Sequence, residues 1–137
     1  MKVAIISDRY SLQTKHDIIS KMVFPSRISF VDLGEFDTLS THSPTEHNSV
    51  ELIMKQLNRY VESVRTHEVS FFISISDSGI SGQIYANKID GFIAAAVSDK
   101  FVLEDAFNHK CNFFEISSNI GVDAAIDIIN QILLRFK

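Results

Sequence analysis

The residues best suited to chemistry lie in one polar turn, residues 76–82, which reads Ser-Asp-Ser-Gly-Ile-Ser-Gly. Its two glycines allow the backbone to approach a ligand closely or to adopt a positive φ. The turn precedes a helical pattern, and the first N–H groups of a helix attract an oxyanion or a phosphate. The turn therefore predicts an anion-binding site, and the alternative is an ordinary capped start of a helix.

The motifs that hold common cofactors are missing from the sequence. It contains neither the Walker pattern nor the glycine fingerprint of dinucleotide-binding proteins, so nucleoside triphosphates and NAD are not favoured. Cys111 is the single cysteine, which excludes an intrachain disulfide and a thiolate metal cluster. His16, His47 and His67 show no ligand spacing. We therefore expect neither a metal nor a cofactor.

The elements that must position the turn follow from apolar patterning. Five apolar runs predict strands at residues 3–7, 28–33, 71–75, 92–97 and 113–116. They are apolar throughout instead of alternating, which is typical of strands buried on both faces of a parallel sheet. Helical patterns follow each strand, at residues 12–22, 49–68, 80–88, 99–109 and 122–136, and residues 35–48 are expected to form a long loop.

This alternation predicts an α/β fold: a three-layer, Rossmann-like (flavodoxin-like) domain with a five-stranded parallel sheet. No internal repeat or linker divides the chain, so residues 1–137 are expected to form a single domain. In such sheets ligands bind at the carboxyl ends of the strands. That rule places the candidate site on three turns, residues 7–10, 76–82 and 98–99.

Composition narrows the classes of partner. Hydrophobic residues make up 45% of the chain and charged residues 22%, a balance typical of globular domains. The net charge of -4 supplies no broad basic field, so nucleic acid is not an expected partner. The apolar stretch at residues 3–6 is too short for a signal-peptide core, and no run approaches the length of a membrane span. We therefore expect a cytoplasmic protein with no membrane partner.

Residues 85–99, which read YANKIDGFIAAAVSD, resemble a segment typical of one enzyme family. This is the family of type B ribose-5-phosphate isomerases and galactose-6-phosphate isomerase subunits. Residues 2–8 match its first strand and serine-aspartate, while residues 31–34 and 41–44 resemble its second strand and the following loop. The resemblance covers nearly the whole chain in order. It implies an aldose–ketose isomerase that acts on a phosphorylated sugar through an enediolate.

The resemblance also implies an oligomer, because family members are dimers or tetramers that share sites between subunits. The last helical pattern agrees, since residues 122–136 are apolar on more than one face. A helix that covers only its own sheet keeps one polar face. A homo-oligomer, or a hetero-oligomer with a related subunit, is therefore expected, and deeper burial of this helix within one chain is the alternative.

The proton-abstracting base is where the sequence departs from the family. The family's ribose enzymes use a cysteine at the position of Ser76, and an unassisted serine hydroxyl is a poorer base than a thiolate. Asp77 follows, as in the A-type subunit of galactose-6-phosphate isomerase, which lacks the cysteine and works with a B-type partner. Asp77 is therefore predicted either to be the base or to cap the following helix. A degenerate family member, which binds a sugar phosphate or stabilises a partner without turnover, is the alternative function.

The other implied site residues come from matching positions. Asp8 keeps the family's place for a residue that orients the sugar ring, with capping of the next helix as its alternative role. Arg9 stands where the family has a histidine and is a candidate phosphate ligand. Asn119 stands where an arginine is expected. The expected catalytic set is Asp77, Ser76 and Asp8, and the expected substrate- and phosphate-binding set is Arg9, Ser78, Gly79, Ser81, Gly82, His42, Asn108 and His109.

Overall fold

The computed structural model describes residues 1–35 and 46–136, with the side chains of residues 46–52 outside the description. The elements run in the order β1 (Lys2–Ser7), α1 (Leu12–Lys21), β2 (Ser29–Glu35), α2 (Glu46–Arg65), β3 (Phe71–Ser76), α3 (Ser81–Ala86), β4 (Ala94–Ala96), α4 (Lys100–Asn108), β5 (Phe113–Ser117) and α5 (Val122–Arg135). Short 3₁₀ helices, η1 (Arg9–Ser11) and η2 (Ser118–Ile120), follow β1 and β5. Most of the expected loop 35–48, including His42, lies outside the described residues.

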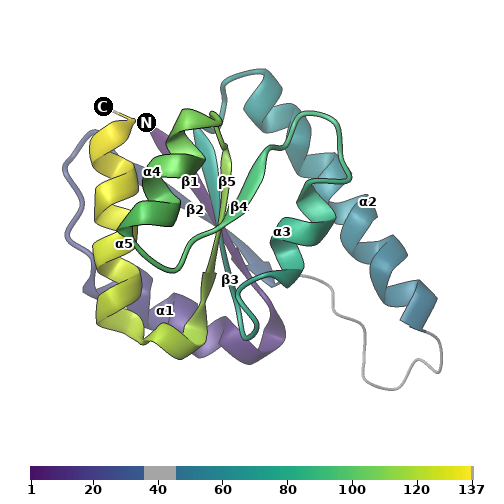
Figure 1. Cartoon of the computed structure of the whole chain (residues 1–137), viewed down its shortest axis with the longest axis horizontal. Coiled ribbons are helices and arrows are strands. Elements are labelled where there is room, and N and C mark those ends of the chain that lie inside the picture. Colours follow the sequence, from purple (N-terminus) through teal and green to yellow (C-terminus); the bar gives the residue numbers. More distant parts are fainter. Residues whose placement is uncertain (36–45, 137) are drawn as a thin grey trace.

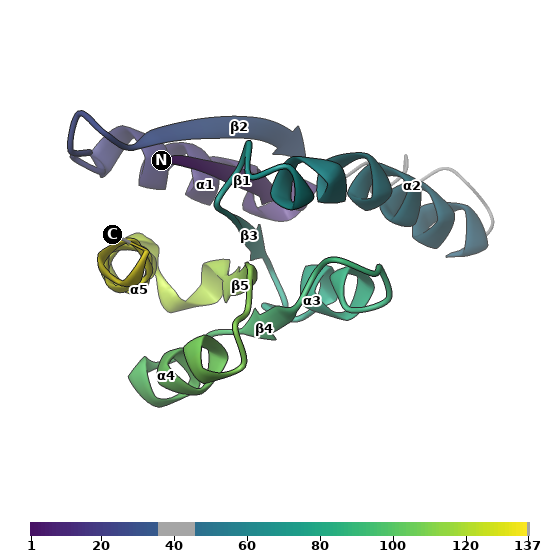
Figure 2. The same ribbon diagram turned by 90° about the horizontal axis from the view of Figure 1, so that it is seen from above.

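The strands form one parallel sheet in the order β2-β1-β3-β5-β4. Helices α1, α4 and α5 cover one face and α2 and α3 cover the other, as Figures 1 and 2 show. The predicted three-layer, Rossmann-like class with five parallel strands is therefore confirmed. The order places β5 inside the sheet, between β3 and β4, and leaves β4 at an edge.

Two predicted elements are shorter in the structure. The strand expected at residues 92–97 pairs only over Ala94–Ala96, because side-chain amides bind the backbone before and beside it. Asn112 Oδ1 accepts from the Ile93 N–H, and Asn87 exchanges two hydrogen bonds with the backbone of Ala94. The helix expected at 80–88 ends at Ala86, where the N–H of Lys88 turns to the carbonyl of Tyr85.

The expectation of wholly apolar strands is wrong at two interior positions. Ser74 in β3 and Glu115 in β5 are fully buried, and the register pairs them directly across the two strands. Because alternate residues of a strand share a face, both point to the α3 side with Phe72 and Phe113. A polar pair therefore interrupts the core beneath α3.

Burial within one chain accounts for the apolar character of α5. Ala125, Ile128, Ile129, Ile132 and Leu133 are buried, because α5 packs against the sheet and against both α1 and α4. Leu134 is the exception, with 60% of its surface exposed. The structure thus follows the deeper-burial alternative, and the apolar residues of this helix do not require a subunit interface.

The path of the chain explains where a site can form. The helix after β3 lies on one face of the sheet, whereas the helices after β1 and β5, the strands on either side of β3, lie on the opposite face (Figure 2). The connections therefore diverge on both sides of the carboxyl end of β3. Such points, where neighbouring connections leave in opposite directions, are where open α/β sheets bind ligands.

Candidate active site

Asp8 ties the carboxyl ends of β1 and β3 together. One of its carboxylate oxygens accepts from the N–H of Ser11 at 2.8 Å, which caps the 3₁₀ helix η1. The other accepts from the N–H of Asp77 at 3.0 Å. Asp8 therefore caps the start of η1, and the same carboxylate also binds the backbone of the polar turn at the candidate site.

Asp77 is held from β5 and does not cap α3. Its carbonyl accepts from Ser117 Oγ at 3.0 Å and from Asn119 Nδ2 at 2.8 Å, and Asn119 Nδ2 also lies 3.3 Å from its carboxylate. The helix start is served by Ser78, whose Oγ accepts from the N–H groups of Ile80 and Ser81. The prediction that Asp77 caps the helix is therefore wrong. Its exposed carboxylate lies beside Asn119 at the sheet edge.

Two serines of the turn bind three of its own N–H groups. Ser76 Oγ accepts from the N–H of Gly79 at 2.9 Å, and Ser78 Oγ takes the next two N–H groups. Gly79 has φ +76°, and a Cβ there would lie 2.7 Å from the Cβ of Ser117. An oxyanion that bound at the outer end of this turn would replace the Ser78 hydroxyl as acceptor.

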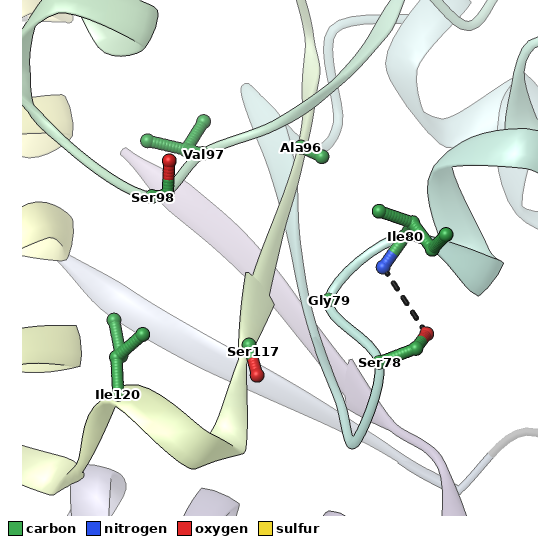
Figure 3. A pocket seen from close by; sticks show the side chains of 8 residues that line it. All are labelled: Ser78, Gly79, Ile80, Ala96, Val97, Ser98, Ser117 and Ile120. Carbon is green, nitrogen blue, oxygen red and sulfur yellow. Dashed lines mark hydrogen bonds between the residues drawn. The ribbon is translucent and has the colours of Figure 1, made fainter.

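A small cavity of about 190 Å³ lies between the turn and the loop after β4. Figure 3 shows Ser78, Gly79 and Ile80 on one side, with Val97 and Ser98 on the other. Its remaining lining comes from Ala96, Ser117 and Ile120. Hydroxyls and aliphatic groups line this space, and it is smaller than the cavities of roughly 300–1,000 Å³ that enclose drug-sized ligands.

The other predicted binding residues divide between two ends of the sheet. Arg9 lies in η1, next to Asp8, with its guanidinium 5.6 Å from the centre of the Tyr10 ring. Asn108 and His109 end α4, which runs back across the sheet, so they lie at the amino ends of the strands. His109 lines a different cavity, of about 390 Å³, together with Ile93 and Cys111. Within one chain these two residues do not join the turn.

Glu115 is the residue that the sequence reading missed. It is fully buried beneath the first turn of α3, where a Cβ at Gly82 would overlap its carboxylate and lie 2.9 Å from Ser74 Oγ. The sequence signal was available in retrospect, because Glu115 is the one charged residue in an otherwise apolar run. Gly82 has no positive φ, so the space that the Glu115 carboxylate occupies explains the glycine.

The surroundings of Glu115 favour its neutral form. Burial raises the pKa of this carboxyl, and the negative charge of Asp8 raises it further. The Ser76 and Ser74 hydroxyls and the N–H of Gly82 act in the opposite direction, with a smaller total effect on the pKa. Among the residues that the structure describes, none meets hydrogen-bonding geometry with either carboxylate oxygen. The carboxyl thus lies buried on the same face of the sheet as Ser76, at a diagonal position in the neighbouring strand.

Over residues 1–35 and 46–136, no group of three or more histidine, cysteine, aspartate or glutamate side chains is arranged to hold a metal ion. Within the same residues, no helix combines the length and apolar character needed to cross a bilayer.

Solved structures of ribose-5-phosphate isomerase B share this fold. The enzyme from Giardia lamblia is 21% identical, with a TM-score of 0.72 over 97% of this chain and 94% of that one. The Thermotoga maritima enzyme is 24% identical, with a TM-score of 0.71 over 96% of this chain and 85% of that one. The Mycoplasma genitalium enzyme, solved with bound ribulose-5-phosphate, is 21% identical, with a TM-score of 0.67 over 96% and 82%.

At these identities the structural likeness shows the fold, and the sequence itself supplies the family. A search of curated proteins gave no match. The sequence model of the ribose/galactose isomerase family, however, matches residues 3–133, which is nearly the whole chain. Together with the parallel sheet and the polar turn at its carboxyl edge, this match shows that the chain belongs to the ribose/galactose isomerase family.

Proposed function

We propose that this chain is a sugar-phosphate aldose–ketose isomerase that acts through an enediolate, alone or as the A-type subunit of a two-component enzyme. The observation that carries the proposal is the family match over residues 3–133. It is supported by the meeting of Asp8, the turn 76–82 and Asn119 at one edge of the sheet. The solved relatives are named as ribose-5-phosphate isomerases, so ribose 5-phosphate is the first substrate to test.

The residues at this edge suit the parts of such a reaction. The carboxylate of Asp8 can accept hydrogen bonds from sugar hydroxyls, and the guanidinium of Arg9 can bind a phosphate. Backbone N–H groups of the turn can stabilise an oxyanion once Ser78 yields them. A base is supplied either by the exposed carboxylate of Asp77 or by Ser76 with help from a buried acceptor.

A second copy, or a related subunit, completes the proposed binding set. Asn108 and His109 lie at the end of the sheet away from the turn. They can contact a substrate only at a site that another subunit provides or shares. We therefore include an oligomer in the proposal.

The test is proton exchange at carbon 2 of the sugar. The purified chain is incubated in ²H₂O with ribose 5-phosphate or with galactose 6-phosphate, and the loss of the carbon 2 proton signal is followed by NMR. Exchange with one sugar is expected, since it reports the enediolate even when net conversion is slow. Absence of exchange with both sugars, for the chain alone, would count against independent activity.

A degenerate, binding-only member of the family is the second candidate. It is favoured by Ser76 in place of the cysteine and by a turn whose N–H groups are bound by its own serines. Ser76→Cys separates the two functions. An isomerase that appears only in this variant indicates an intact pocket that lacks a base, whereas binding of the sugar phosphate without exchange in either protein supports the degenerate function.

A further inference from the structure

The buried polar cluster beneath α3 is the feature that the proposed function does not yet use. We name it the Glu115 cluster and define it as Ser74, Ser76, Gly82 and Glu115. The first two come from β3, Glu115 comes from β5, and Gly82 lies in the first turn of α3. The two strands are direct neighbours, with Ser74 opposite Glu115 and Ser76 opposite Ser117. Ser76 and Glu115 therefore occupy diagonal positions on one face of the sheet.

The buried carboxyl of Glu115 lowers the stability of the fold, and packing does not explain why a glutamate occupies this position. A buried carboxylate without a cation or matched hydrogen bonds is strongly disfavoured, and an apolar residue of similar size would suit a strand interior better. The structure nevertheless leaves room for the carboxylate by having glycine at position 82. Groups that bear such a cost are characteristic of functional sites.

Ser76 connects this buried carboxyl to the edge where a ligand would bind. It is the last residue of β3 and precedes Asp77, whose N–H is held by Asp8. Its oxygen accepts from the N–H of Gly79, which leaves the hydroxyl proton to be donated elsewhere. Ser76 lies diagonally opposite Glu115 on the same face of the sheet, and its hydroxyl lowers the pKa of that carboxyl. Asp77, in contrast, has an exposed carboxylate beside Asn119.

We propose that Ser76 and Glu115 form a proton relay that abstracts the carbon 2 proton of the substrate, an inference that rests on the isomerase function proposed above. Ser76 is the catalytic residue of this relay, and its oxygen must become accessible when substrate binds, because Ser76 is only 1% exposed in the free chain. Glu115 is a positioning residue, which orients the Ser76 hydroxyl and accepts its proton. The buried carboxyl thus assists the serine that replaces the family's cysteine.

With an aldose phosphate as substrate, the relay conserves protons and electrons in both halves of the reaction. Ser76 Oγ takes the proton from carbon 2 while its own hydroxyl proton passes to the Glu115 carboxylate. The C–H electron pair becomes the C1–C2 double bond, and the carbonyl electrons move to oxygen 1. In the second half, Ser76 protonates carbon 1 and recovers its proton from Glu115, while one proton moves from oxygen 2 to oxygen 1 to give the ketose. No other reactant is consumed.

The first experiment compares carbon 2 proton exchange in the wild type, Glu115→Gln, Ser76→Ala and the double variant, with the sugar that the wild type accepts. Each single variant is expected to lose roughly 100-fold or more in kcat with little change in KM. The double variant should lose no more than the worse single one, because the two residues act as a unit. Asp77→Asn removes the alternative base, the exposed carboxylate beside Asn119, and so distinguishes that base from the relay.

The pH dependence of kcat distinguishes a relay from a structural role. The relay requires ionised Glu115, so wild-type kcat should rise with pH through the pKa of this carboxyl. Asp8 is the charged group among those that shift this pKa, and the hydroxyls of Ser74 and Ser76 and the N–H of Gly82 are the neutral ones. The rise should vanish in Glu115→Gln. Full exchange in that variant, or loss of exchange in Asp77→Asn alone, would overturn the relay and leave the isomerase function standing.

A second measurement requires no turnover. Carbon-13 NMR of the Glu115 side-chain carboxyl should show a pKa above the ordinary value of 4.5, and Ser76→Ala should raise it further by removing the hydroxyl. Ser78→Ala is the matched control, because Ser78 lies in the same turn but is not among the groups that shift this pKa. An ordinary pKa, or the same pKa in Ser76→Ala, overturns the relay. Absence of exchange in the wild type with every sugar phosphate overturns both proposals.

Discussion

Gly82 and Glu115 form one packing unit, since the missing side chain of the first is filled by the carboxylate of the second. Gly82→Ala is therefore expected to destabilise the fold by about 1–3 kcal/mol, the usual cost of overpacking, despite the higher helix propensity of alanine. The same substitution in a Glu115→Ala background should cost less, because the overlapping carboxylate is gone. Urea unfolding of the two single variants and the double variant measures this coupling.

The control for this cycle is Gly82→Ala combined with Glu62→Gln, a change to an exposed carboxyl on α2. That pair should be additive, since the two positions share no contact partner. Equal costs for Gly82→Ala with and without Glu115 would contradict the packing that the structure describes.

Glu115 also makes stability depend on pH. Its pKa is raised in the folded chain, so folding favours the protonated carboxyl. The stability that this provides is fully present below the ordinary value of 4.5 and is lost as the pH rises through the folded pKa. Glu115→Gln, which cannot ionise, is expected to be more stable than the wild type at neutral pH by about 1–3 kcal/mol, because it removes a buried charge whose desolvation costs more than that of the neutral amide.

Urea unfolding between pH 4 and pH 8 checks this expectation. The advantage of Glu115→Gln should shrink towards pH 4, where the wild-type carboxyl is protonated in both states. A difference between the two proteins that stays constant over this range would show that Glu115 does not titrate as proposed.

At the scale of elements, a half-buried ion pair joins α1 to β2. Lys15 is fully buried, with its Nζ 2.6 Å from Asp32 Oδ1 and 2.6 Å from the carbonyl of Gly34. Burial alone would raise the pKa of Asp32. The hydrogen bonds from Lys15 and from the N–H of Gly34, with the charges of Lys15 and His16, outweigh burial and lower it. The pair therefore stabilises the fold above the ordinary Asp32 value of 3.8 and less below it.

Lys15→Met tests this element contact while keeping the volume of the side chain. The loss is expected to be about 1–3 kcal/mol at neutral pH, less than for a fully buried pair, because Asp32 can be solvated. The gap from the wild type should narrow as the pH falls through the lowered pKa of Asp32. Thermal unfolding at pH 7 and near pH 3 measures both parts, and a gap that widens in acid would contradict the assignment.

At the scale of the whole molecule, the question for α5 is whether it belongs to the core of one chain or to an interface with a partner. Its buried face belongs to the core of one chain, so Ile129→Ala should cost about 2–5 kcal/mol of stability, as large-to-small core changes do. Leu134→Ser, on the exposed side, should change stability by less than about 0.5 kcal/mol. Because the buried face of α5 is used within one chain, we expect Leu134→Ser to leave the mass measured by light scattering unchanged. A shift to a smaller species would place α5 in an interface.

The sequence by itself determined the class of fold and the family, and it predicted the edge of the sheet where we place the candidate site. Continuous apolar runs report burial on both faces, and the segment 85–99 carries the resemblance that the family match confirms. The residue types that form a turn are also neighbours in the sequence, so the polar turn at residues 76–82 could be predicted without a structure. These features depend on residues within a few positions of one another.

Only the tertiary structure decided which distant residues meet. The order β2-β1-β3-β5-β4 brings β5 beside β3, and this pairing places Glu115 behind Ser76 and Asn119 against Asp77. It also sends Asn108 and His109 to the far end of the sheet. β3 and β5 lie about 40 residues apart, and the packing of the whole core determines that they pair. No local sequence pattern indicates this pairing. For this reason the scaffold could be predicted from the sequence, whereas the position of the Glu115 carboxyl behind Ser76 could not.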